Sequence, residues 1–555
     1  MGESPTPWVT KGATSNYALD ERRRAALAEV DSAPFSWFHV RVVCVAGAGF
    51  FADAYDIFGI NIVATMIGYV YGARSAPGTP GKLSSNQDLG LKVATPVGTL
   101  VGQLLFGWLA DIVGRKRLYG VELIIIMFCT FAQALSSGNH TVSIVGVLVV
   151  WRFLMGIGIG GDYPLSAIIT SEFAPTRIRG RMMSTVFAFQ GWGNFAAVFL
   201  SFIVTVAFKK RILADDIDTL NQVDYIWRIV IGLGCLPAVA SLYFRLTIPE
   251  TPRFTMDIER NVIQASDDID AVLTRGSFNY DPDAVIQRAD APRASWDDFV
   301  SYFGKWENGK ILLGTAWSWF SLDIAFYGLG LNSSIILQAI GFGTPPTKGT
   351  EAVYDNLHNA TVGNLILSAA GLIPGYWAAF FLVDFWGRKP LQLMGFIVLT
   401  TLFIIMGFGY NTLTATTSGR NAFVFLYCLT NFFQNCGPNT TTFLIPGEIF
   451  PTRYRATGHG ISAASGKFGA IIAQVGFSHM VDIGGTNKFI PHLMEMLAFF
   501  MLTGVFSTLL LPETKQISLE ELSNEKQKGF VKGLTSRIEV QDGIVIRKHM
   551  ETVYD

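Results

Sequence analysis

The sequence predicts an all-α polytopic membrane protein with twelve transmembrane helices in two pseudo-symmetric six-helix halves. Three observations support this fold class: an apolar composition, twelve apolar runs of spanning length, and short motifs that occur twice in the same order. The 555 residues are 50% hydrophobic and 15% charged, with a mean hydropathy of +0.37, which is more apolar than a soluble chain of this length requires. The formal net charge of -1 leaves no basic field that would attract nucleic acid.

Apolar runs of about 20 residues, the length that a helix needs to cross a bilayer, define the predicted spans. They cover residues 38–69, 91–110, 118–136, 142–171, 182–207, 226–246, 311–340, 361–384, 391–410, 421–446, 459–481 and 491–511. We therefore expect a cytoplasmic N-terminal segment (1–37), a six-helix bundle (38–248), a polar cytoplasmic loop (249–309), a second bundle (310–515) and a cytoplasmic tail (516–555). No cleavable signal peptide is evident, so the first span is expected to act as the targeting signal.

An internal repeat relates the two halves. "LADIVGRKR" (109–117) follows the second span and "LVDFWGRKP" (382–390) follows the eighth. "SEFAPTRIRG" (171–180) matches "GEIFPTRYRA" (447–456), and the halves end in "IPETPR" and "LPETK". Glycine and basic residues often end helices, but three matched landmarks in one order indicate a duplicated unit.

The basic residues of short loops predict the orientation, because cytoplasmic loops carry the excess of Lys and Arg. Five clusters fall on one side, whereas Lys209, Lys210 and Arg211 fall on the other. Both termini are then cytoplasmic, most simply at the plasma membrane, and the sequons at Asn139 and Asn359 lie outside, where glycosylation is possible. The five cysteines lie in apolar stretches without metal-ligand spacing, so we expect buried thiols, no metal and no cofactor.

Ionisable residues inside spans are functional candidates, because a charge in hydrocarbon is costly unless it faces a cavity or a partner. Asp53 and Asp56 share one face of the first span. Trp319, Asp323 and Tyr327 recur every four residues in the seventh, and Lys467 lies among small residues in the eleventh.

The fourth span holds a glycine ladder, "GIGIGGDYP" (156–164), which we expect to admit a close neighbouring helix and to turn Asp162 and Tyr163 toward a cavity. It is not a nucleotide-binding loop, because no strand precedes it and no Lys-Ser/Thr follows it. Arg152 and Asp162 are ten residues apart, so contact would require a bend, and their pairing stays open.

Amides add neutral hydrogen-bond donors to these charged residues. Asn431, Asn435 and Asn439 recur at four-residue spacing in the tenth span, where we expect Pro438 to loosen the backbone. Gln190 and Asn194 lie in the fifth span. Amide, indole and phenol donors with one ammonium suit a small tetrahedral oxyanion better than a cation. A carboxylate beside such an anion requires one of the two to hold a proton, which is the coupling that a proton symporter needs.

The repeated Asp-x-x-Gly-Arg-Lys motifs and "GGDYPLSAIITSEF", "SWFSLDIAFYGLGLNSSIIL" and "CGPNTTTFLIPGEIFPTRYRATGHGISAASGKFGAIIAQ" resemble the Major Facilitator Superfamily, over about residues 38–515, and within it the inorganic phosphate:proton symporters of the fungal high-affinity type. The resemblance implies a phosphate site at Tyr163, Gln190, Trp319, Asp323, Tyr327, Asn439 and Lys467. It also implies proton handling by Asp53, Asp56 and Asp162. We add Arg152 and Asp323 to the proton-coupling set, and we expect gating contacts at Asp111, Arg115, Glu172, Asp384, Arg388 and Glu448.

The predicted function is proton-coupled phosphate uptake by alternating access, with phosphate, protons and the lipid bilayer as partners. Three matters stay open: which aspartate carries the transported proton, the protonation state of the phosphate, and the oligomeric state. One alternative is a proton-coupled sugar or polyol carrier, against which Lys467 argues because a neutral sugar offers it no counter-charge. Another is a phosphate receptor that does not transport. An enzyme is not indicated, because no nucleophile and base set occurs outside the spans.

Each candidate also has a purely structural interpretation. The buried charges could only fix helix packing, the aromatics could pack or anchor at the interface, and the asparagines could join neighbouring helices by hydrogen bonds.

Overall fold

The computed structural model describes residues 27–74, 76, 78–138, 141–246, 251, 253–254, 294–340, 348–523, 534–541 and 544–552. The Asn139 sequon, most of the predicted N-terminal segment and most of the predicted central loop lie outside these residues.

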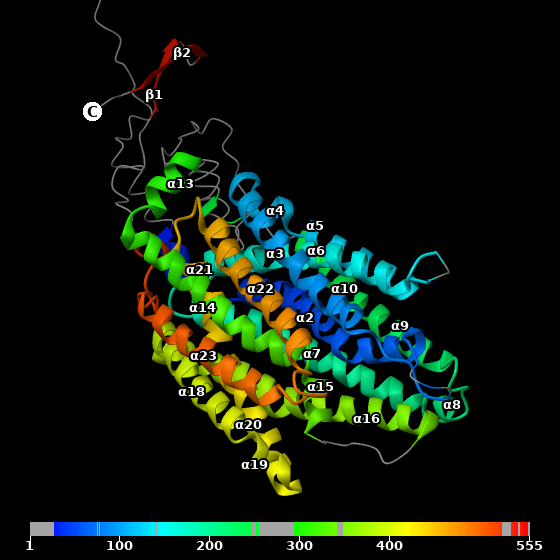
Figure 1. Ribbon diagram of the computed structural model, residues 1–555. Coiled ribbons are helices and arrows are strands. Elements are labelled where there is room, and N and C mark those ends of the chain that lie inside the picture. The colour runs from blue at the N-terminus through cyan, green and yellow to red at the C-terminus, as the bar shows by residue number, and fades with distance from the viewer. Residues whose placement is uncertain are drawn as a thin grey trace, which may run out of the picture.

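Long helices run side by side to form an elongated bundle (Figure 1). The first half comprises α2 (Trp37–Tyr71), α3 (Ser85–Val113), α4 (Arg115–Leu118), α5 (Val121–Leu135), α6 (Ile144–Phe173), α7 (Arg179–Ala207), α8 (Lys209–Leu213), α9 (Asn221–Leu233) and α10 (Cys235–Leu246). The second half comprises α14 (Trp306–Gly330), α15 (Ser333–Ala339), α16 (Gly349–Leu367), the π-helix η1 (Ser368–Leu372), α17 (Ile373–Trp386), α18 (Arg388–Phe408), α19 (Tyr410–Ala415), α20 (Thr417–Cys436), α21 (Pro438–Ile449), α22 (Arg455–Met480) and α23 (Ile490–Leu509). The short helices α13 (Trp296–Phe303) and α24 (Leu519–Leu522) flank this half.

The helices match the twelve predicted spans, and the fold class is confirmed. Among the described residues, nine helices are long and apolar enough to cross a membrane, or ten if the pair α14 and α15, bent by 59°, counts as one. Two predicted spans remain: the tenth, formed by α20 together with α21, and the eleventh, formed by α22. Both are richer in Asn, Thr, Ser and Gly. Many of their polar side chains are buried inside the bundle, which explains why they are less apolar than a span that faces lipid on all sides.

The glycine ladder of α6 permits a close helix approach, as predicted. A Cβ atom at Gly156 would collide with the carbonyl oxygen of Thr95, and one at Gly160 with that of Thr99. Both carbonyls belong to α3, so the missing side chains let α3 and α6 pack backbone to backbone. The α6 helix continues without interruption through Pro164.

Helix breaks occur beside the interface between the halves. The tenth span is divided at Gly437, where α20 ends and Pro438 begins α21, as the proline in the sequence led us to expect. The eighth span contains the π-helix η1, a feature that often occurs at functional sites. The two halves meet chiefly where α3 packs on α22 and where α7 packs on α16 and α17.

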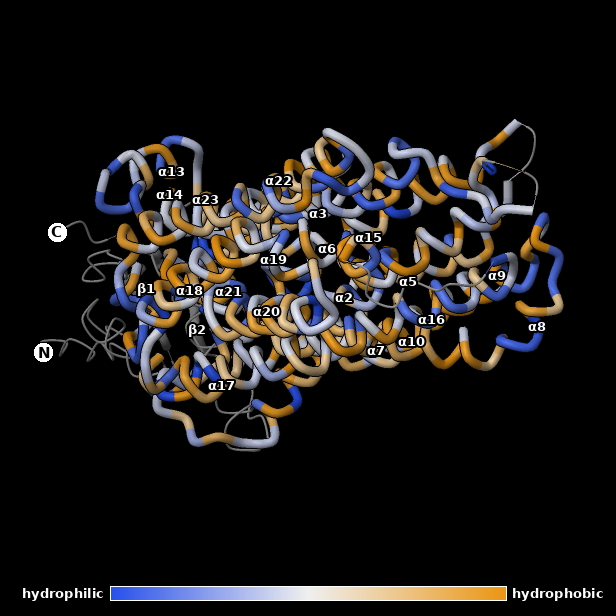
Figure 2. The backbone as a smooth tube through the Cα atoms, turned by 60° about the horizontal axis from the view of Figure 1, so that its bottom comes forward, coloured by the Kyte–Doolittle hydropathy of each residue, from blue (hydrophilic) through white to orange (hydrophobic). Residues whose placement is uncertain are grey.

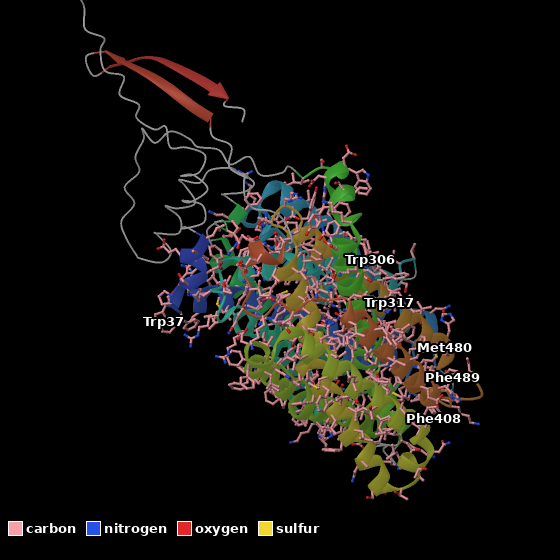
Figure 3. All side chains as sticks on the ribbon, turned by 90° about the vertical axis from the view of Figure 1, so that its left-hand side faces the viewer. Trp37, Trp306, Trp317, Phe408, Met480 and Phe489 are labelled. Carbon is pink, nitrogen blue, oxygen red and sulfur yellow. The ribbon has the colours of Figure 1, made fainter. Side chains whose placement is uncertain are left out.

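The outer surface of the bundle suits a bilayer. Figure 2 shows hydrophobic, orange stretches along helices such as α7 and α10. Large aromatic side chains lie near both ends (Figure 3): Trp37 and Trp306 at one, Phe408 and Phe489 at the other. Trp37 and Phe408 are 78% and 75% exposed, which is the position that aromatic residues take at the boundary between lipid and water.

The expectation of buried thiols was wrong for two of the five cysteines. Cys44 is exposed and Cys235 is partly exposed, whereas the other three cysteines are buried; an apolar run can face lipid as well as the protein interior, so hydropathy alone did not predict burial.

The Asn359 sequon lies inside α16 and is half-buried. The helix begins at Gly349, ahead of the predicted start of this span at 361. The placement of Asn359 outside the membrane stays a prediction.

The tail adds a small β element. Strand β1 (Leu534–Gln541) pairs with β2 (Ile544–Thr552) in an antiparallel hairpin, which Figure 1 shows apart from the helices. Hydropathy patterning aimed at spans had not predicted this hairpin. The predicted all-α fold of twelve helices therefore applies to the membrane-spanning part of the chain.

Candidate functional site

A buried ion pair lies at the centre of the bundle. The Lys467 Nζ atom of α22 lies 2.7 Å from Asp323 Oδ2 of α14. Both side chains are only 2% exposed. Leaving either charge without the other would be strongly destabilising, because water does not solvate it there. The structure thus brings together two of the charged residues that the sequence had singled out.

Aromatic rings from both halves surround the ammonium group. Lys467 Nζ lies 4.5 Å from the ring centroid of Tyr327 and 5.0 Å from that of Tyr163. Such cation–π contacts are strengthened when the cation is removed from water. The Trp319 ring lies 6.4 Å from the Tyr163 ring. Because Tyr163 comes from α6 and Tyr327 from α14, the ammonium group is shared between the two halves.

A chain of hydrogen bonds crosses the interface next to this pair. Gln190 Nε2 donates to the Tyr163 hydroxyl at 2.8 Å, and the Tyr376 hydroxyl donates to Gln190 Oε1 at 2.8 Å. Asn439 Nδ2 donates to Tyr376 at 2.9 Å. The seven residues of the predicted phosphate site therefore form one buried group, the central cluster: Tyr163, Gln190, Trp319, Asp323, Tyr327, Asn439 and Lys467.

Sequence reasoning missed Tyr376, which the structure adds to the central cluster. This residue lies in α17 of the eighth span and is 1% exposed. The sequence "IPGYWAAF" looks like an ordinary apolar helix segment with one tyrosine. In the folded chain α17 packs against α7, which carries Gln190. The contact with Gln190, 186 residues earlier, exists only in the folded chain.

A second buried charge cluster lies within the first half. Arg245 of α10 contacts Asp162 Oδ2 and Glu122 Oε1, each at 2.6 Å. Asp162 also accepts a short hydrogen bond from Ser166. The Asp162 partner is therefore Arg245, and Arg152 does not fill that role. Sequence reasoning singled out neither Arg245 nor Glu122, because both lie at the ends of apolar runs, where charges are common.

Asp53 and Asp56 have different surroundings, although they share a helix. Asp53 is fully buried near Asp162 and Arg245, and neither of its oxygens has a hydrogen-bond partner among the residues that the structure describes. Asp56 accepts from the Thr130 hydroxyl at 2.7 Å and lines a narrow pocket of about 10 Å³ together with Arg152 and Gln133, which is room for about one water molecule. The Arg152 side chain bonds to the backbone oxygens of Leu91 and Asp56. The role of Asp56 beside a cavity stays a prediction.

Charged residues join the two halves at one end of the bundle, here called the ionic end and defined by Asp111, Glu172, Asp384 and Glu448. Glu172 of α6 contacts Arg455 of the second half at 2.8 Å, and Glu448 contacts Arg179 of the first half at 3.0 Å. Glu172 also binds Arg115, and Glu448 also binds Arg388. All six residues predicted as gating contacts lie in this network.

The two aspartates of the repeated motif each bind the first turn of a helix in the other half. Asp111 accepts hydrogen bonds from the backbone N–H groups of Ala456 and Thr457 at the start of α22. Asp384 accepts one from the backbone N–H of Arg181 at the start of α7. A carboxylate is favourable there because the free N–H groups and the dipole of a helix are positive at its N-terminus. The two copies of the sequence motif therefore make equivalent contacts in the folded protein.

The tail and the N-terminal segment attach to the ionic end through Arg253. Its guanidinium group lies 2.8 Å from Glu520 of α24 and 2.9 Å from Asp31, and it donates to the Glu172 carbonyl oxygen. Burial opposes ionisation of Glu520, but the Arg253 charge outweighs it and lowers the pKa of this carboxyl to about 2. The same ion pair raises the pKa of Arg253.

Hydrogen bonds to neutral side-chain acceptors join the halves at the opposite end, here called the amide end. Asn61 donates to Ser333 at 2.6 Å, and Lys92 donates to Asn332 at 3.1 Å. A small pocket of about 30 Å³ lies here between the halves. Its polar lining includes Asn61, Asn194, Asn364 and Asn431. The interface is thus ionic at one end and amide-lined at the other.

Comparisons with known proteins agree with this architecture. Residues 42–525 match the model of the family described as "Sugar (and other) transporter". The chain is 50% identical to the repressible high-affinity phosphate permease of Neurospora crassa, covering 91% of this chain and 90% of that protein. It is 48% identical to the inorganic phosphate transporter PHO84 of Saccharomyces cerevisiae, covering 91% and 87%.

Solved structures resemble the fold. The proton:xylose symporter XylE, bound to 6-bromo-6-deoxy-D-glucose, matches with a TM-score of 0.63 at 18% identity, covering 88% of this chain and 98% of that one. A double tryptophan mutant of XylE matches with a TM-score of 0.64 at 20% identity, covering 88% and 99%. At this identity the likeness concerns the arrangement of helices alone.

Proposed function

The chain belongs to the sugar (and other) transporter family of the Major Facilitator Superfamily, and from this premise we propose that it takes up inorganic phosphate together with protons by alternating access. It is a membrane transporter and not an enzyme. The names of the relatives support phosphate as the substrate. The single observation that carries the proposal is the Lys467–Asp323 pair, buried among hydroxyl and amide donors from both halves.

The central cluster has the chemistry to bind a phosphate ion. Lys467 supplies positive charge, while Tyr163, Gln190 and Trp319 supply neutral donors. An anion that enters beside Asp323 competes with this carboxylate for the ammonium group. At least one of the two acidic groups must then hold a proton, because two anions in a low-dielectric site repel each other strongly. Phosphate binding and proton binding are thereby linked.

Proton coupling is assigned to the buried acids. Asp323 lies beside the substrate position, and Asp53, Asp56 and Asp162 lie in the first half with Arg152. Within the described ranges, Asp53 has no hydrogen-bond partner for either oxygen, and a charge in that position would be costly. Since Arg245 neutralises only one of the carboxylates that it contacts, the acidic cluster of the first half suits the storage of a proton.

The different chemistry of the two ends supports alternating access. The ionic end is closed by ion pairs and by contacts with helix N-termini, and the amide end is joined by hydrogen bonds to neutral acceptors around a small pocket. In this proposal the ionic end faces the cytoplasm, with both termini there, and the membrane is the plasma membrane. Rocking of the two halves would break the cross-half bonds at one end while those at the other form.

Uptake by purified protein in liposomes tests the proposal. Labelled phosphate should enter under an inward proton gradient and should stop entering when a protonophore is added. Asp323→Asn and Lys467→Ala should each abolish accumulation. The control Tyr427→Phe removes a buried hydroxyl that donates to the Leu329 carbonyl oxygen, outside the central cluster, and should retain uptake.

Other outcomes would identify the alternatives. Accumulation of a hexose or polyol in place of phosphate would establish the sugar carrier. Phosphate binding without crossing would establish the receptor. Uptake that persists without a gradient and with the protonophore would refute proton coupling.

A further inference from the structure

The hydrogen-bond chain through the central cluster has only one possible direction. It begins at the backbone carbonyl oxygen of Asn431, which can only accept. Asn435 Nδ2 donates to this oxygen at 2.6 Å, so Asn435 Oδ1 is left to accept. Asn439 Nδ2 donates to Asn435 Oδ1 at 2.7 Å. The first amide is therefore oriented by the helix backbone, and it orients the second.

The same direction continues across the interface through Tyr376. Asn439 Nδ2 uses its second hydrogen on the Tyr376 oxygen, so the Tyr376 hydrogen is free to donate to Gln190 Oε1. The Gln190 amide is then oriented with Nε2 toward the Tyr163 oxygen. Tyr163 accepts this bond and keeps its own hydrogen as a donor.

This direction of the hydrogen bonds leaves one side-chain acceptor available to a substrate. Both hydrogens of Asn439 Nδ2 are used, so the side chain can offer only its carbonyl oxygen Oδ1 to a substrate. Within the described part of the chain, no group donates to this oxygen. The cluster thus presents donors at Lys467 and Tyr163 and a neutral acceptor at Asn439.

We propose that Tyr376 is a specificity-determining positioning residue, which holds Asn439 with its carbonyl oxygen toward the substrate, so that the site selects an oxyanion that carries a hydroxyl group. Hydrogen phosphate and dihydrogen phosphate have a P–OH that can donate to Oδ1. Sulfate has no hydrogen to donate at neutral pH, so one of its oxygens would face the carbonyl oxygen. A buried acceptor that loses its donor is costly, and a site built around such a bond rejects the analogue that lacks it. This inference rests on the proposed function.

Competition by sulfate tests this inference in the same liposomes. Phosphate uptake is measured against rising sulfate, and against arsenate, which retains the hydroxyl, for the unchanged protein and for Tyr376→Phe. The phenylalanine keeps the ring but frees both amides to turn. A second variant, Asn435→Ala, removes the anchor without altering a residue of the central cluster. Tyr427→Phe is the matched control, and thermal melting checks that each variant is folded.

In both test variants we expect the KM for phosphate to rise about tenfold, because the loss of one hydrogen bond weakens binding by about this factor. The inhibition constant of sulfate, divided by that of phosphate, should fall about tenfold. The inhibition constant of arsenate, divided by that of phosphate, should stay the same. A folded Tyr376→Phe protein with the selectivity of the Tyr427→Phe control would overturn the inference. Absence of phosphate uptake by the unchanged protein would instead refute the proposed function.

Discussion

Replacing Glu448 by glutamine tests whether the ionic end holds the transporter closed on that side. The carboxylate makes three bonds: to Arg179 at 3.0 Å, to Arg388 at 2.8 Å and to the Thr514 hydroxyl. Only Arg179 belongs to the other half. The bonds to Arg388 and Thr514 remain when the halves separate, so their loss lowers overall stability without favouring either conformation.

The conformational effect therefore comes from one cross-half bond. A hydrogen bond to a charged group contributes about 1.5 to 3 kcal/mol, which corresponds to a change of about tenfold to hundredfold in the equilibrium constant for opening at the ionic end. The expected effect of Glu448→Gln is an increase of this size in the open population. It should be accompanied by a lower melting temperature, because the buried guanidinium groups lose their counter-charge.

Spin-label distances measure the open population. Labels at the exposed positions Arg117 and Trp386, one in each half at the ionic end, should report a longer distance component in Glu448→Gln. Glu513→Gln is the matched control, because Glu513 bonds the backbone N–H groups of Arg388 and Lys389 within its own half. An unchanged distance distribution in Glu448→Gln, or an equal shift in the control, would refute this reasoning.

Three further predictions concern stability and pH. Lys467→Ala and Asp323→Asn should each lower the melting temperature, and the double variant should lose less than the sum of the two, because each single change leaves one buried charge unpaired. The contact of Glu520 with Arg253 should persist from pH 8 to pH 5 and weaken as the pH falls from about 4.5 toward 2, since a pKa lowered to about 2 stabilises the docked tail only above these values. Hydrogen-exchange protection factors of α24, corrected for the intrinsic pH dependence of amide exchange, that change between pH 5 and 8 would contradict this. Gly160→Val should prevent the close approach of α3 and α6, and so lower the yield of folded protein in size-exclusion chromatography. An unchanged melting temperature of this variant would contradict the backbone contact between the two helices.

Much of the fold follows from local patterns in the sequence. Hydropathy over about 20 residues predicted the spans because each transmembrane helix must satisfy its backbone hydrogen bonds within itself. Pro438 predicted the break in the tenth span, and the glycines of α6 predicted a close neighbour. The repeated motifs predicted matched roles for Asp111 and Asp384, which the structure bears out as two equivalent contacts with helix N-termini.

Which side chains meet was decided by the tertiary structure. The sequence supplied Lys467, Asp323 and Gln190 as candidates, because polar groups in apolar helices are conspicuous. It gave no sign that Tyr376 joins Gln190 to Asn439, or that Arg245 is the partner of Asp162. These contacts depend on the rotation and depth of helices far apart in the chain. Periodicity identifies the polar face of each helix, but only packing between helices determines which faces come together.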